Sequence, residues 1–143
     1  MRAAIEEAKI AASIGEVPIG AVVVRDGEII ARAHNERETG KDATRHAEII
    51  AIERACAALG GWRLIGCDLY VTLEPCPMCA GATVNARVVR VVYGASDLRA
   101  GAFGSIINLN DYPLNHKPEI VRGVLADECL EPIQAFFKER RKK

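Results

Sequence analysis

The sequence has 143 residues, of which 50% are hydrophobic and 27% are charged. This length predicts a single domain, residues 1–143, and the composition excludes both a disordered chain and a collagen-like one. The formal net charge is zero, so the charge balance by itself does not indicate a nucleic-acid partner. No apolar run reaches the roughly 18 residues that a membrane span needs, and the first residues are too charged for a signal peptide. We therefore expect a cytoplasmic protein that contacts no membrane.

Helices and strands alternate along most of the predicted order of elements. Apolar residues at helical spacing predict the helices, and short apolar or β-branched runs predict the strands. Asp26-Gly27 separates two such runs and is a strong signal for a two-residue hairpin turn. We expect Pro132 to split the last helix. The expected elements are a helix at 2–14, strands at 19–24 and 28–33, a helix at 44–59, a strand at 69–73, a helix at 77–86, strands at 88–93 and 120–121, and a helix at 126–141.

This order of elements indicates the fold class. Strands that alternate with helices after an initial hairpin predict an α/β sandwich around one mostly parallel sheet. The stretch from Gly94 to Pro118 has only a weak pattern and receives no assignment beyond a loop. The sequence shows no internal repeat, linker or low-complexity segment.

Five cysteines are present, and only Cys76 and Cys79 form a close pair. In a reducing compartment such a pair indicates metal or redox chemistry before a disulfide framework. A thioredoxin-like redox pair would not account for the motif His46-Ala47-Glu48. A structural zinc site with four cysteine ligands would need a second close pair of cysteines. The remaining cysteines are expected to be small buried apolar residues; they are Cys56, Cys67 and Cys129.

A catalytic zinc site takes three protein ligands and leaves a fourth position for water. His46, Cys76 and Cys79 supply that number. Because Pro77 favours the first turn of a helix, both cysteines are expected at a helix start, where the positive end of the helix favours the thiolate form. The spacing is therefore suited to holding a metal ion.

Glu48 is the candidate for moving protons. A carboxylate beside a metal-bound water can take a proton from that water and deliver it to the substrate. Residues two apart on a regular helix point about 200° from each other. His46 and Glu48 can therefore face one metal only at the first turn of their helix, and the polar loop before Thr44 permits this position.

Two motifs together carry a family resemblance. His46-Ala47-Glu48 and Pro75-Cys76-Pro77-Met78-Cys79 fit the signature of zinc-dependent nucleobase deaminases. With residues 15–21, 73–82 and 123–129, nearly the whole chain resembles the bacterial tRNA-specific adenosine deaminases. The resemblance implies a cytidine deaminase-like, three-layer α/β/α sandwich with a mixed five-stranded sheet, a homodimer, and one Zn²⁺ per subunit. It also implies conversion of adenosine to inosine at the wobble position of a tRNA anticodon stem-loop.

The resemblance also implies individual roles. His46, Cys76 and Cys79 match the zinc ligands, and Glu48 matches the proton shuttle. Asn35, Ala47 and Asp97 match residues that bind the substrate, although Asn35 and Asp97 are also ordinary turn residues. Residues 136–143 resemble an RNA-contacting last helix, and a solvated basic tail fits them equally well.

Two other functions remain open from the residues alone. A deaminase of free guanine or cytosine would use the same metal chemistry with different pocket walls. A non-catalytic RNA-binding subunit would keep zinc only for folding, but such a site has no use for Glu48 beside an open coordination position.

Overall fold

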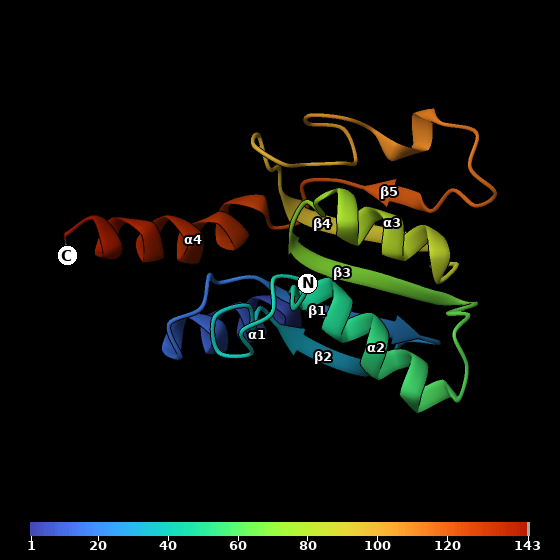
Figure 1. Ribbon diagram of the computed structural model, residues 1–143, viewed down its shortest axis with the longest axis horizontal. Coiled ribbons are helices and arrows are strands. Elements are labelled where there is room, and N and C mark those ends of the chain that lie inside the picture. Colours follow the sequence, from blue (N-terminus) through green and yellow to red (C-terminus); the bar gives the residue numbers. More distant parts are fainter. Residues whose placement is uncertain (143) are drawn as a thin grey trace.

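The computed structural model describes residues 1–142 and shows one sheet with helices on both faces (Figure 1). Apart from the short turn of η1, the elements lie close to the predicted ranges. Within residues 1–142, no helix combines the length and the apolar character that crossing a membrane requires. In chain order the elements are α1 (Arg2–Ser13), β1 (Gly20–Arg25), β2 (Glu28–His34), α2 (Ala47–Leu59), β3 (Cys67–Leu73), α3 (Pro77–Asn85), β4 (Arg90–Ala95), η1 (Leu109–Asp111), β5 (Glu119–Val121) and α4 (Ala126–Arg141).

The sheet has five strands in the order β2-β1-β3-β4-β5. The predicted hairpin of β1 and β2 is confirmed, and Asp26 and Gly27 both adopt the positive φ that a two-residue turn requires. The prediction of a mostly parallel sheet is wrong, because β1 also pairs antiparallel with β3, and only the β3–β4 and β4–β5 pairings are parallel. The reason is that β1 lies between β2 and β3, a non-local pairing that the order of elements does not reveal. The mixed five-stranded sheet is confirmed.

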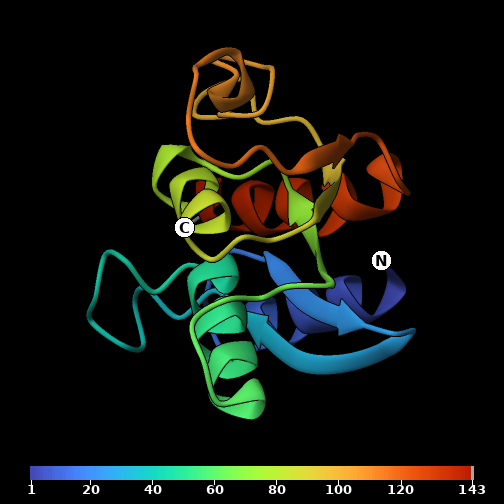
Figure 2. The same ribbon diagram turned by 90° about the vertical axis from the view of Figure 1, so that its right-hand side faces the viewer.

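Helices cover the two faces of the sheet in pairs. In Figure 2, α2 and α3 lie on the near face, and α1 and α4 lie behind the sheet. Aliphatic side chains of the strands and of α2 form the main core, and β3 and β4 run through its centre. The carboxyl ends of these two parallel strands lie at the same edge of the sheet, and the functional residues gather there.

Pro132 does not split the last helix, which corrects the sequence prediction. α4 runs without a break from Ala126 to Arg141, and Pro132 lies inside it. Cys129 and Ile133, the neighbours of Pro132 on one helical face, are both buried against the rest of the molecule. This packing holds the helix together across the hydrogen bond that proline cannot make. The C-terminal part of α4 extends past the edge of the sheet (Figure 1).

Candidate metal centre and substrate cavity

His46 is placed by the start of α2. The helix begins at Ala47, three residues later than predicted, and His46 is the N-cap with extended backbone angles. The polar loop before it is held by turns of its own, such as the bond from the amide of Thr44 to the carboxylate of Asp42 at 2.8 Å. His46 therefore reaches past the helix end while Glu48 lies in the first turn. This arrangement lets both side chains face one site, although residues two apart on a regular helix point about 200° from each other.

Cys76 and Cys79 are placed by the start of α3. Cys76 is the N-cap, Pro77 is the first helical residue, and Cys79 is fully buried in the first turn. Proline fits this position because the amide hydrogen it lacks would have no partner inside the helix. The positive ends of α2 and α3 thus point toward the same group of side chains, and they favour negative charge there.

The three predicted ligands come together in space. Nδ1 of His46 lies 3.6 Å from Sγ of Cys76 and 3.5 Å from Sγ of Cys79. All three ligand atoms lie within 4.8 Å of one another, so the group could hold a metal ion. Among residues 1–142, no other group of three histidine, cysteine or acidic side chains meets this condition.

The cluster favours a thiolate at Cys76. The thiol of Cys79 donates to Cys76 and lowers the pKa of Cys76 to about 4; burial opposes this shift, and a hydrogen bond with His46 supports it. The same pairing with Cys76, together with burial, raises the pKa of Cys79 far above its usual value. Because thiolate sulfur is the form that binds metals, one ligand is already ionised at neutral pH.

Glu48 is a buried carboxyl group beside this cluster, with only 4% of the residue exposed. Burial raises the pKa of its carboxyl to about 7, and its own backbone N–H and His46 reduce that shift without cancelling it. The carboxyl is also within hydrogen-bonding reach of the Cys79 thiol. A buried acid next to a potential metal site is the arrangement expected of a group that exchanges protons during a reaction.

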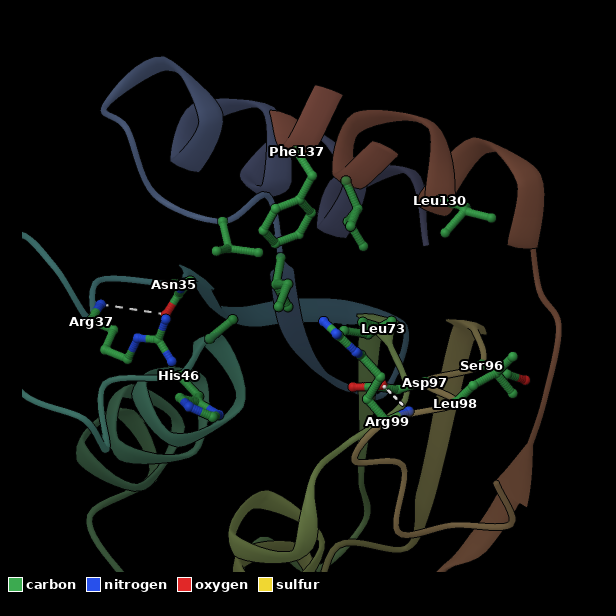
Figure 3. A pocket seen from close by; sticks show the side chains of 14 residues that line it. Asn35, Arg37, His46, Leu73, Ser96, Asp97, Leu98, Arg99, Leu130 and Phe137 are labelled. Atoms are coloured by element: carbon green, nitrogen blue, oxygen red, sulfur yellow. Dashed lines mark hydrogen bonds between the residues drawn. The ribbon is translucent and has the colours of Figure 1, made fainter. Parts of the chain in front are cut away.

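His46 lines a cavity of about 450 Å³. Its volume lies within the range of about 300–1,000 Å³ that small-molecule sites occupy. Figure 3 shows that its side chains come from both ends of the sequence, because Asn35 and Arg37 approach from one side and α4 closes another. The apolar part of the lining consists of Val17, Ile19, Ala47, Leu73, Leu98, Leu130, Ile133 and Phe137.

All three predicted substrate-binding residues line this cavity; they are Asn35, Ala47 and Asp97. Asn35 is 5% exposed, and its Oδ1 accepts from the amide of Arg37 at 3.4 Å. The carboxylate of Asp97 accepts from the amides of Arg99 at 3.0 Å and Ala100 at 3.2 Å, as drawn for Arg99 in Figure 3. Both side chains therefore stabilise their own turns as well as facing the cavity.

Two buried carboxylates were not predicted, although both stand in the segments that carry the family resemblance. Glu16 is fully buried and accepts from the amides of Glu38 at 3.1 Å and Thr39 at 2.6 Å. Glu74 is 2% exposed and accepts from amides that follow Asp97 in the chain. An acid directly beside an apolar run is the available sequence signal, but only the fold shows which loops these acids hold.

The last helix contributes Phe137 to the cavity. The rings of Phe136 and Phe137 meet edge to face with centroids 5.4 Å apart, and the guanidinium of Arg140 lies 4.5 Å from the ring of Phe136. Arg141 and Arg99 border a second hollow that shares Phe137 with the main cavity. The predicted RNA-contacting end thus reaches the mouth of the cavity as far as it is described; its final residue, Lys143, lies outside the described residues.

Comparisons with known proteins agree with this geometry. Residues 1–141 match the MafB19-like deaminase family. The tRNA-specific adenosine deaminase of Bacillus subtilis is 58% identical over 144 residues, which cover 100% of this chain and 89% of that protein. A structure from a study of A-to-I editing by tRNA:A34 deaminases at the wobble position superposes with a TM-score of 0.90 at 47% identity, covering 92% of this chain and 96% of that one.

A solved guanine deaminase of Bacillus subtilis is more distant. It is 36% identical and has a TM-score of 0.65, with 96% of this chain and 90% of that chain covered. Both measures fall below those of the tRNA:A34 deaminase structure. By the extent and the degree of its similarity, the chain belongs to the tRNA-specific adenosine deaminases, within the MafB19-like deaminase family.

Proposed function

We propose that this protein hydrolyses the exocyclic amine of the wobble adenosine in a tRNA anticodon, giving inosine and ammonia. The observation that carries the proposal is the group of His46, Cys76 and Cys79 with Glu48 beside it, next to a largely apolar cavity that His46 lines. Relatives named for this activity match the entire length of the chain. A wobble-editing deaminase has the same fold.

Zinc is the metal that we propose for the cluster, because the spacing of the donors fits it. A tetrahedral zinc ion has Zn–N distances of about 2.0–2.1 Å and Zn–S distances of about 2.3 Å, which place nitrogen and sulfur about 3.6 Å apart. The His46 nitrogen lies 3.6 and 3.5 Å from the two sulfurs. Thiolate sulfur and imidazole nitrogen also bind zinc in preference to magnesium or calcium, which favour oxygen donors.

The chemistry divides between the metal and Glu48. Held by His46, Cys76 and Cys79, a zinc ion would lower the pKa of a bound water, which could then act as a nucleophile near neutral pH. The carboxylate of Glu48 would take the first proton of this water and pass it to the ring nitrogen next to C6. It would then take the proton of the hydroxyl group now on C6 and give it to the amine, which leaves as ammonia. The buried position of Glu48 limits exchange of these protons with solvent.

We propose that the cavity lining selects the base. Asn35 and the backbone of Ala47 hydrogen-bond the flipped base, and Asp97 contacts the sugar and backbone around it. Phe137, at the cavity mouth, offers a ring on which a neighbouring base can stack. The guanidinium groups of Arg99 and Arg141 near this ring attract the phosphates of a single-stranded loop.

The direct test uses an anticodon stem-loop with adenosine at the wobble position. Incubation with the zinc-loaded protein should convert that adenosine to inosine, measured by nuclease digestion and chromatography. A stem-loop with its only loop adenosine moved to another position serves as the control and should remain unchanged. Folded, zinc-loaded protein that forms no inosine would contradict the proposal.

A second candidate function is deamination of free guanine. It is favoured by the similarity to the solved guanine deaminase of Bacillus subtilis. The two functions differ in the substrate and share the metal chemistry. Ammonia release from free guanine, cytosine and adenosine, measured beside inosine formation in the stem-loop, separates them: turnover of a free base without turnover of RNA would favour the second candidate.

We also propose that two copies associate and that they act in the cytoplasm on tRNA. Apolar side chains at the start of α3 and after β4 are exposed, and a second copy would remove them from water; they include Met78, Ile106 and Ile107. Light scattering after size-exclusion chromatography should give twice the mass of one chain. A monomer at micromolar concentration with full activity would contradict this part of the proposal.

A further inference from the structure

Glu74 is a buried carboxylate to which the proposed function gives no role. It follows β3 directly and stands two residues before Cys76. Only 2% of the residue is exposed, and it is not among the residues that line the cavity. Its backbone amide donates to the carbonyl of Ala95 at 2.9 Å, which continues the pairing of β3 with β4. Glu74 is therefore held firmly in the frame of the sheet.

The side chain of Glu74 accepts four hydrogen bonds. Oε1 accepts from the amide of Asp97 at 3.1 Å and from the hydroxyl of Ser105. Oε2 accepts from the amides of Phe103 at 3.0 Å and Ser105 at 3.1 Å. An ionised carboxylate accepts about four hydrogen bonds and donates none, so these donors match its full capacity. All four come from one segment, residues 97–105.

One more hydrogen bond and one close approach link the same segment to residues 74 and 75. The amide of Ala102 donates to the carbonyl of Pro75 at 2.9 Å. Gly101 lies so close to Glu74 that a Cβ at this position would meet the carboxylate itself. A side chain at position 101 would therefore displace either the carboxylate or the segment and disturb the bonds between them.

The opposite side of this segment faces the cavity. Ser96, Asp97, Leu98 and Arg99 all line it, as Figure 3 shows. The amide of Asp97 thus bonds to Glu74 behind the segment, while the Asp97 side chain belongs to the wall in front. Glu74 connects this wall to the strand end that continues into Cys76.

We propose that Glu74 is a positioning residue: its carboxylate fixes residues 97–105 relative to the candidate metal-binding turn at Cys76, and the start of this segment is one wall of the cavity. This inference rests on the proposed function, because its kinetic test measures inosine formation. Glu74 acts through the loop and does not touch the substrate, so its loss should weaken substrate binding more than it slows the chemical step at Glu48.

The test is Glu74→Gln. Glutamine has the same shape but places an NH₂ group opposite backbone N–H donors, so at least one strong bond is lost. We expect KM for the anticodon stem-loop to rise about tenfold, while kcat stays within about twofold and the zinc content is unchanged. Amide hydrogen exchange at Asp97, Phe103 and Ser105 should accelerate about tenfold, since these amides lose their acceptor.

Two further variants keep the proposal testable if Glu74→Gln does not fold. Ser105→Ala removes only the hydroxyl bond and should raise KM less than Glu74→Gln does. Gly101→Ala keeps the carboxyl group but places a Cβ against it, so the carboxylate or the segment must move and the bonds between them weaken; KM should rise as in Glu74→Gln.

The matched control is Asp68→Asn, at the other end of β3. Asp68 accepts from Nη2 of Arg90 on β4 at 2.7 Å, so this change alters a carboxylate contact between β3 and β4 themselves, away from residues 97–105. It should leave KM and the exchange of residues 97–105 unchanged.

The outcomes separate the two proposals. A zinc-loaded Glu74→Gln with wild-type KM and wild-type amide exchange would overturn the positioning role. If Glu74→Gln fails to fold, wild-type KM and exchange in Gly101→Ala would overturn it instead. If the wild-type protein forms no inosine, the proposed function fails, and faster exchange confined to residues 97–105 in Glu74→Gln would still support the positioning role.

Discussion

The metal centre and the substrate cavity are built in different ways. His46, Glu48, Cys76 and Cys79 all lie at the first turns of two helices, where a cap and one helical turn fix each side chain. The cavity walls instead come from loops and from α4, and segments far apart in the sequence meet there. Local sequence sets each side chain of the first region at its helix start, although α2 and α3 must still meet; the second region draws on segments from both ends of the chain.

This difference teaches where chemistry and selectivity reside. Zinc deaminases share the metal chemistry, so the helix starts should determine whether any amine is hydrolysed. The loops and α4 should determine which base is accepted. Changes in the metal centre are therefore expected to abolish turnover of every substrate, and changes in the walls are expected to alter binding of RNA.

The largest effect is expected for Cys76→Ala. Changes in the outer shell of metal sites already cost about 10–100-fold in affinity, so loss of a ligand should reduce zinc affinity by more than about 100-fold and abolish inosine formation. Zinc content by mass spectrometry and turnover should fall together. Cys56→Ala, which changes a half-buried cysteine on α2 outside the cluster, should leave both unchanged. If Cys76→Ala retained zinc and activity, Cys76 would not be a metal ligand.

Glu48→Gln should have the next largest effect. Loss of general acid–base catalysis lowers turnover by about 10²-fold or more, and the zinc content should stay at one ion per chain because Glu48 is not a ligand. Glu53→Gln is the control, since Glu53 lies on the same helix with its side chain 65% exposed. A normal rate in Glu48→Gln would assign the proton transfers to another group.

Asn35→Ala tests the wall next to His46. Loss of one hydrogen bond to the base should lower kcat/KM for the stem-loop about tenfold, without loss of zinc. Asn85→Ala, at the exposed end of α3, should have no effect. An unchanged kcat/KM in Asn35→Ala would show that this asparagine serves only its own turn with Arg37.

The smallest effect is expected for Phe137→Ala. Stacking on an aromatic ring contributes about 1–3 kcal/mol per base, and the half-exposed ring of Phe137 favours the lower end, or about a fivefold rise in KM for RNA. The rate with free adenosine should not change. Tyr112→Ala removes another exposed aromatic side chain, away from the cavity, and serves as the control. Equal loss with RNA and with free adenosine would argue against stacking.

Much of the fold followed from the sequence because its signals are local. The turn at Asp26-Gly27, the end of α2 at Gly60 and the start of α3 at Pro77 lie where the sequence predicts them. Two features did not follow. The antiparallel pairing of β1 with β3 depends on strand order in space, and the unbroken α4 depends on tertiary packing around Pro132.

The same division holds for the candidate site. The three candidate ligands were identified by a short motif, and their ligand atoms lie within 4.8 Å of one another, so they could hold a metal ion. The contributions of Leu130, Ile133 and Phe137 to the cavity were not predicted, because a helical pattern does not tell which distant loop a helix meets. The roles of Glu16 and Glu74 were missed for the same reason, since their partners lie more than 20 residues away.

X-ray absorption at the zinc edge of the purified protein tests the central claim most directly. The account predicts one zinc ion per chain with two sulfur neighbours at about 2.3 Å and two nitrogen or oxygen neighbours at about 2.0–2.1 Å, one from His46 and one from solvent. Four sulfur neighbours, or a protein purified without a tightly held metal ion, would contradict it.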